Sequence, residues 1–128
     1  MIDMWVKFNN NPTGRSNVGD CAVRAVSVAL DVSWEDAFWM IAENAFMMGD
    51  VMSSNVVWGS VLRQHGFKKR TTPDTCPECY TFNDFCEDHP QGIYVLCTGN
   101  HVATVIDGTL YDSWNSSDEI VDFYWEMS

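Results

Sequence analysis

The sequence is short of basic residues. Seven Lys and Arg oppose eighteen Asp and Glu over 128 residues, which leaves a formal net charge of −11. Nucleic acids and anionic membranes bind positively charged surfaces, so this balance argues against both as partners. The chain also lacks an apolar run long enough to span a bilayer, and no secretory signal pattern opens it. We therefore expect a cytoplasmic protein that binds neither nucleic acid nor membrane.

The cysteines are too few and uneven in number for a disulfide scaffold. Five are present, whereas small secreted domains carry an even and denser set. No internal repeat, low-complexity segment or interdomain linker is visible. Apolar residues make up 46% of the chain and aromatic residues 13%, which is too much for a disordered acidic tail. We expect one globular domain, residues 1–128.

Helical patterns fill the first half of the chain. Asp20 is the expected N-cap of a helix over 21–30, which is apolar at nearly every position and should be buried. A capping sequence at Ser33 starts a second helix, and a third runs from about 54 to 64. The second helix has one apolar stripe: Trp34, Ala37, Phe38, Ile41, Ala45 and Met48.

Strand patterns dominate the second half. Asp107-Gly108 is a strong signal for a two-residue hairpin loop between two strands. The basic run Lys68-Lys69-Arg70 indicates a solvated surface patch. The order of helices first and antiparallel strands afterwards predicts an α+β fold. The expected elements are a short helix over 81–88 and strands over 93–97, 101–106, 109–114 and 120–125.

Cys21 is the first candidate for chemistry. The backbone N–H groups and the positive dipole end of a helix N-terminus favour a thiolate, which is the nucleophilic form of cysteine. The neighbouring Asp20 carboxylate opposes this unless it turns into the cap. Taken alone, Cys21 also fits a small core residue.

The hairpin supplies a partner. If Asp107 and Gly108 form the loop, paired positions sum to 215, so Ala103 lies opposite Asp112. Side chains alternate between faces, which makes His101 and Asp112 diagonal neighbours on one face. That spacing allows a hydrogen bond that would orient the imidazole and stabilise its cation. Asn115 has the wrong parity for this contact. A surface His beside an exposed Asp is the alternative.

Together these residues resemble the papain-like cysteine peptidases, in which Cys at the head of a central helix precedes His and then Asn or Asp. Asp112-Ser113-Trp114 resembles the Asn-Ser-Trp of papain relatives, and Asp20-Cys21 resembles the bacteriocin-processing C39 peptidases. The resemblance implies that Cys21 is the nucleophile, His101 the general base and acid, and Asp112 the orienting residue. It also implies that Trp114 shields the His–Asp bond from water. Most of the chain further resembles small proteins of Firmicutes and their phages, through the Gly-Asp-Cys opening and the His-Val-Ala hairpin.

The sequence departs from the papain pattern before the nucleophile. Papain relatives place a Gln a few residues upstream to help form the oxyanion hole, and residues 15–20 contain none. Asn17 is the best substitute, acting with the Cys21 backbone N–H. The chain is also short for a peptidase. Both points leave open a relative that keeps the fold without turnover.

A second cysteine cluster, with the pattern C-x2-C-x6-C-x2-H, invites comparison with zinc sites. The spacing matches no common zinc module, and the CxxC lacks the context of a redox motif. We favour reduced structural thiols and expect no cofactor, with zinc as the alternative. The four residues are Cys76, Cys79, Cys86 and His89.

Three functions remain open. The leading hypothesis is a thiol hydrolase that cleaves a peptide or isopeptide bond in a peptide or protein substrate. An acyl or amide transferase would use the same residues with an amine acceptor. The third is a binding or regulatory module, which includes an acidic nucleic-acid mimic that occupies a basic site on another protein.

Overall fold

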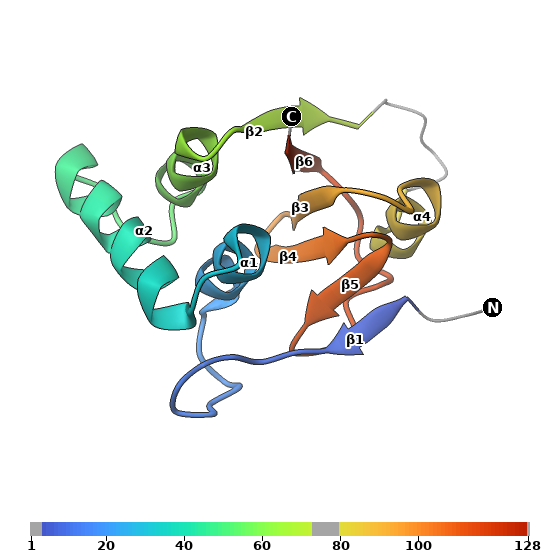
Figure 1. The fold of residues 1–128 in the computed structure, drawn as a ribbon, viewed down its shortest axis with the longest axis horizontal. Helices are drawn as coiled ribbons and strands as arrows, with labels where there is room; N and C mark the ends of the chain where they lie inside the picture. Colours follow the sequence, from blue (N-terminus) through green and yellow to red (C-terminus); the bar gives the residue numbers. More distant parts are fainter. Residues whose placement is uncertain (1–3, 73–79, 128) are drawn as a thin grey trace.

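A computed structural model describes residues 4–72 and 80–127 of the chain as an α+β fold. Helices predominate in the first half and strands in the second, as the sequence predicts (Figure 1). The helices are α1 (Cys21–Leu30), α2 (Trp34–Met48), α3 (Asn55–Gln64) and α4 (Phe82–Asp88). The strands are β1 (Trp5–Lys7), β2 (Phe67–Thr71), β3 (Ile93–Thr98), β4 (His101–Ile106), β5 (Thr109–Asp112) and β6 (Phe123–Met127).

The strands form one six-stranded sheet in the order β1-β5-β4-β3-β6-β2. Among the described strands, β1 and β5 pair in parallel and the other pairings are antiparallel. The hairpin β4–β5 therefore lies inside the sheet, flanked by β3 and β1. This position gives the two strands neighbours on both sides and fixes their register.

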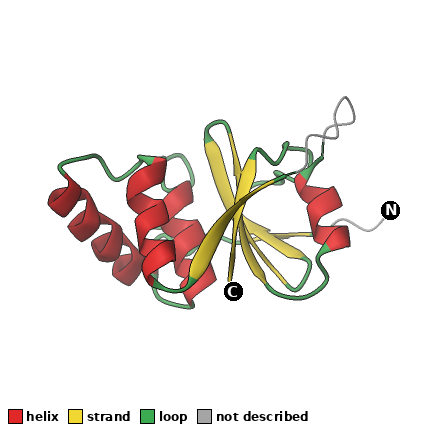
Figure 2. Ribbon diagram, turned by 90° about the horizontal axis from the view of Figure 1, so that it is seen from above, coloured by secondary structure: helices red, strands yellow, loops and turns green. Residues whose placement is uncertain are grey.

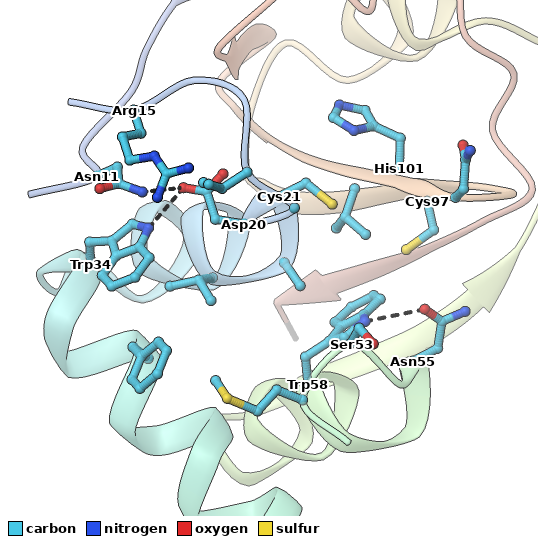
Figure 3. A pocket seen from close by; sticks show the side chains of 18 of the residues that line it. Asn11, Arg15, Asp20, Cys21, Trp34, Ser53, Asn55, Trp58, Cys97 and His101 are labelled. Carbon is cyan, nitrogen blue, oxygen red and sulfur yellow. Dashed lines mark hydrogen bonds between the residues drawn. The ribbon is translucent and has the colours of Figure 1, made fainter. Parts of the chain in front are cut away.

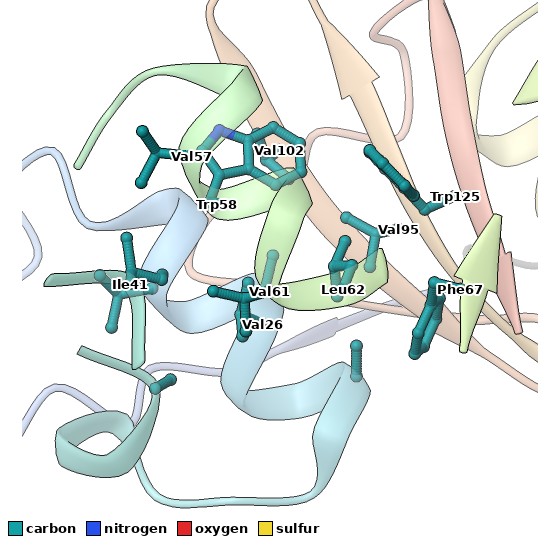
Figure 4. Packing of buried hydrophobic residues seen from close by; sticks show 14 of the residues in the cluster. Val26, Ile41, Val57, Trp58, Val61, Leu62, Phe67, Val95, Val102 and Trp125 are labelled. Atoms are coloured by element: carbon teal, nitrogen blue, oxygen red, sulfur yellow. The ribbon is translucent and has the colours of Figure 1, made fainter. Parts of the chain in front are cut away.

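Helices cover both faces of the sheet. α1, α2 and α3 lie on one side and α4 on the other (Figure 2). Side chains of α1, α2 and α3 pack against Val95 and Val102 of the sheet and against Trp125 (Figure 4). A second cluster on the α4 side joins Phe82 and Phe85 to residues of β3, β4 and β5. The first of these clusters packs α1 against the central strands.

The α2 helix begins and ends at its expected signals. The Ser33 hydroxyl accepts a hydrogen bond from the Asp36 backbone N–H, and the C-cap Gly49 adopts a left-handed conformation with φ of 67°. The apolar stripe is buried at Ala37, Ile41 and Ala45. The prediction is wrong for Met48, which lies in the last turn of the helix and has 45% of its surface exposed.

Some strands differ from the prediction. β1 and β2 were not expected, and the Lys68-Lys69-Arg70 patch belongs to β2, where it is exposed. β6 begins at Phe123 rather than at residue 120, because Ile120 forms only an isolated bridge with Thr81. β5 ends at Asp112, two residues earlier than expected. Within the described residues, none of the helices is both long enough and apolar enough to cross a membrane.

Candidate active site

Cys21 and His101 each open an element of the fold. Cys21 is the first residue of α1, and His101 is the first residue of β4, against which α1 packs. Asp20 occupies the predicted N-cap position, and its side chain makes no capping hydrogen bond. Its carboxylate instead accepts hydrogen bonds from Arg24, Trp34 and Asn11.

The hairpin has the predicted register. Asp107 and Gly108 form the loop with positive φ angles of 50° and 79°, which suit a two-residue turn. Ile106 pairs with Thr109, so the sum of 215 is confirmed. As a result, His101 Nε2 donates a hydrogen bond of 2.6 Å to Asp112 Oδ2. Parity arguments from the sequence therefore place these two side chains correctly.

Asp112 is completely buried and held from several directions. Its Oδ2 accepts a second hydrogen bond from the Ser116 hydroxyl. Its Oδ1 accepts from the Ser113 backbone N–H at 2.8 Å and from Arg24 Nη2 at 3.1 Å. Burial alone would raise the pKa of this carboxyl, but the hydrogen bonds from His101 and Ser116 and the nearby positive charges lower it. Asp112 is thus a fixed, ionised acceptor.

Arg24 connects Asp112 to the start of α1. It is one of the buried charged residues, with 4% of its surface exposed. While Nη2 contacts Asp112, Nη1 donates a hydrogen bond of 2.9 Å to Asp20 Oδ1. The guanidinium therefore bridges two buried carboxylates, one on each side.

Cys21 and His101 perturb each other in opposite directions. Both side chains line the same cavity, and because Nε2 binds Asp112, Nδ1 is the ring nitrogen left for the thiol. Burial opposes the charged imidazole, yet Asp112 and Cys21 raise the pKa of His101 to about 9. Burial also opposes the thiolate, yet His101, a backbone hydrogen bond from Val102 and the charge of Arg24 lower the pKa of Cys21. Both shifts favour a thiolate–imidazolium pair.

The pair lies in a cavity of about 860 Å³. Figure 3 shows the Cys21 thiol and the His101 ring at one end, with Trp58 across the cavity from them. Trp34 and Phe38 of α2 stack on each other along the apolar wall. A volume in this range holds a small-molecule ligand or a few residues of a peptide. The nucleophile candidate therefore faces space that a substrate can enter.

The remaining sequence candidates have different positions. Asn17 is exposed and is not among the residues that line the cavity. Trp114 is 45% exposed, and its ring centroid lies 4.7 Å from that of His101. The Asn115 side chain accepts hydrogen bonds from Ser117. Trp114 thus covers the imidazole, whereas Asn17 does not reach the site in this structure.

The zinc alternative falls partly outside the described residues. Cys76 and Cys79 lie between residues 72 and 80, outside the described ranges. Cys86 is buried, which raises its pKa to about 12, and His89 stacks on Phe85 while its Nδ1 contacts the Phe85 carbonyl. The part of the chain described by the structure contains no group of three or more side chains suited to a metal.

Comparisons with protein-family models, curated proteins and solved structures found no match to this chain. The interpretation of the site therefore rests on its geometry. Sequence reasoning missed Arg24 and Ser116 as partners of Asp112. A signal existed for Arg24, because a charged residue inside an otherwise apolar, buried helix needs a buried partner.

Proposed function

We propose that the protein is a papain-like thiol hydrolase that cleaves a peptide or isopeptide bond. The observation that carries this proposal is the position of His101, which is hydrogen-bonded to Asp112 and lines the same cavity as Cys21, whose thiolate it favours. Nucleophile, base and orienting group in contact are the arrangement that activates a thiol. Cys21 at a helix start, His101 on a strand and Asp112 on the next strand follow one another in the same order as the Cys, His and Asn or Asp of the papain-like peptidases.

The chemistry needs only these side chains and water. The Cys21 thiolate attacks the carbonyl carbon, and the oxyanion that forms accepts a hydrogen bond from the Cys21 backbone N–H. The C–N bond then breaks, and the leaving amine takes the proton of the His101 imidazolium. Neutral His101 next removes a proton from a water that attacks the thioester. Release of the carboxylic acid restores the thiolate and the imidazolium. Asp112 holds the imidazole in place throughout.

The cavity and the thiols indicate the kind of substrate and the compartment. The cavity lining includes the aromatic side chains of Trp34, Phe38 and Trp58, which suit a peptide or protein segment with bulky side chains. Cys21, Cys86 and Cys97 are free thiols, as expected in a reducing compartment. A cytoplasmic hydrolase with a peptide or protein substrate is therefore part of the proposal.

The test is the pH dependence of iodoacetamide alkylation, read at each of the five cysteines by mass spectrometry. In the parent protein, Cys21 should react fastest below pH 8.5, the ordinary range of a thiol. His101→Ala should slow the reaction at Cys21 because the imidazolium no longer stabilises the thiolate. Cys86→Ser is the matched control: burial raises the pKa of Cys86 to about 12 and this residue does not line the cavity, so its loss should leave the labelling of Cys21 unchanged.

A binding module that retains the fold is the second candidate. It is favoured by one observation: Asn17, the expected oxyanion donor, lies outside the cavity lining. If Cys21 reacts no faster than the other four thiols and His101→Ala changes nothing, the hydrolase proposal is wrong and this candidate stands. If Cys21 is activated, mass spectrometry of products with and without an added amine separates a hydrolase from an acyl transferase.

A further inference from the structure

The buried charges around the candidate site form one connected cluster. Asp20, Arg24 and Asp112 are 7%, 4% and 0% exposed, and the arginine touches both carboxylates. Two carboxylates and one guanidinium sum to one negative charge. Protonated His101, which contacts Asp112, brings these four groups to neutrality, with the thiolate of Cys21 not counted. A buried cluster is most stable when its charges balance and each is hydrogen-bonded.

Arg24 forms two ion pairs with different parts of the fold. Its Nη1 and Nη2 point to different elements: Asp20 immediately precedes α1, and Asp112 ends β5. Asp20 lies beside Cys21 in the sequence, while Asp112 holds His101. A planar guanidinium fixes two acceptors at defined angles, which a lysine ammonium does not.

We infer that Arg24 is a positioning residue that clamps the start of the nucleophile helix to the strand end carrying Asp112. This inference rests on the proposed function. With Oδ1 of Asp112 held by Arg24 and by the Ser113 backbone, Oδ2 faces His101 and Ser116. The same guanidinium neutralises Asp20, whose negative charge would otherwise oppose a thiolate at the adjacent residue. One side chain thus fixes the position of the start of α1 relative to the end of β5 and also supplies positive charge near Cys21.

The test compares Arg24→Met, Arg24→Lys and a matched control in the alkylation assay at Cys21. Arg24→Met removes the positive charge near the thiol, so the pH profile should move to higher pH and the rate at pH 7 should fall about tenfold. Arg24→Lys keeps the positive charge but loses the planar, two-pronged guanidinium, so its alkylation rate at Cys21 should lie between those of the parent and Arg24→Met. Arg63→Met is the control, because Arg63 is exposed and lies over the Trp125 ring. Its profile should match the parent.

A charge-balanced double variant covers the case in which Arg24→Met does not fold. Asp20→Asn with Arg24→Met removes one charge of each sign, so the interior keeps the same total charge, yet Asp112 loses its Nη2 contact. This variant should fold, as circular dichroism would show, and should still alkylate slowly at pH 7. If folded variants without Arg24 keep the parent profile, Arg24 does not position the site. If parent Cys21 is itself unactivated, the proposed function fails instead, which the parent profile alone reveals.

Discussion

The described cysteines show how strongly the surroundings determine the reactivity of one side chain. Burial raises the pKa of Cys86 to about 12 and raises that of Cys97 as well, where the charge of Lys69 offsets only part of the effect. Cys21 also loses solvent, yet its pKa falls, because His101 and Arg24 supply positive charge. Ionisation of the thiol is therefore disfavoured at two positions and favoured at the third. Selective labelling at Cys21 is the expected outcome.

Trp114 permits a test of shielding at the scale of one residue. Trp114→Ala should let water reach the His101–Asp112 hydrogen bond and weaken it, since a higher local dielectric weakens buried charge pairs. The pKa of His101 should then move from about 9 toward its ordinary value of 6.5, as measured by NMR titration of the ring protons. Because about half of Trp114 is exposed, the change should lower the free energy of unfolding by only about 1 kcal/mol.

Trp39→Ala is the matched control for this substitution. Trp39 is 60% exposed on α2, packs edge-on against Phe38 and does not contact His101. Its removal should leave the His101 titration unchanged. An unchanged titration in Trp114→Ala as well would show that the indole does not shield the pair.

At the scale of elements, the sequence predicted what local rules determine. The Asp107-Gly108 turn and strict side-chain alternation sufficed to place His101 next to Asp112. The strands β1 and β2 were missed for physical reasons. β1 has three residues, too few for an alternation pattern, and its parallel partner lies over 100 residues away. β2 is an edge strand with four exposed residues, so its charged sequence carries no apolar face.

The site was predictable to the same extent. Residue types and spacing gave Cys21, His101 and Asp112 as candidates, and the structure places them at the start of α1, the start of β4 and the end of β5. The position of the Asn17 side chain could not be predicted in the same manner, because its loop has no periodic pattern. The sequence there does not indicate which side chains face the cavity. The bridge from Arg24 to Asp112 spans 88 positions, beyond the reach of local rules.

The hairpin turn provides the prediction for this scale. Gly108 has φ of +79°, and an added Cβ would lie 3.2 Å from the Cys86 carbonyl oxygen and 3.5 Å from the Pro90 Cα. Gly108→Ala should therefore combine left-handed strain with a backbone clash and lower the free energy of unfolding by about 2 kcal/mol or more. Urea unfolding measures this change.

Gly49→Ala separates the two effects. Gly49 has a similar φ of +67° at the C-cap of α2, but no atom lies within 4 Å of its added Cβ. Only the strain, about 1 kcal/mol, should remain there. Equal losses at Gly49 and Gly108 would contradict the clash against the Cys86 carbonyl. A larger loss at Gly108 would confirm that the α4 end packs tightly on the turn that sets the β4–β5 register.

At the scale of the whole molecule, the charged cluster lies where the helical layer meets the sheet. α1 contributes Arg24, β4 contributes His101 and β5 contributes Asp112. The Arg24–Asp112 ion pair therefore crosses the boundary between the layers, whereas the His101–Asp112 pair lies within the sheet. Thr104 of β4 adds a hydrogen bond to the Ala25 carbonyl of α1. Apolar packing holds the layers together over most of this boundary. The cluster makes the free energy of unfolding depend on pH.

The sign of that dependence follows from His101. Its pKa is about 9 in the folded protein and 6.5 as the ordinary value, so its contribution is fully present below pH 6.5 and is lost as pH rises through about 9. Cys21 acts in the opposite sense: its lowered pKa stabilises the fold above its ordinary value of 9.0, and this contribution is lost as pH falls. A Cys21→Ser background removes this second titration.

We compare Cys21→Ser with the double variant Cys21→Ser/His101→Gln. The difference between their free energies of unfolding should be largest at pH 6 and should shrink toward pH 9. Urea unfolding at half-unit steps of pH measures it for both proteins. Titration of buried thiols such as Cys97 affects both proteins equally and cancels in the difference. Without the thiolate, Asp112 alone still raises the pKa of His101, so the decrease should remain but begin at lower pH. A difference that stays constant from pH 6 to 9 would mean that Asp112 orients a neutral imidazole and stabilises no cation, which would remove the electrostatic basis for an activated Cys21.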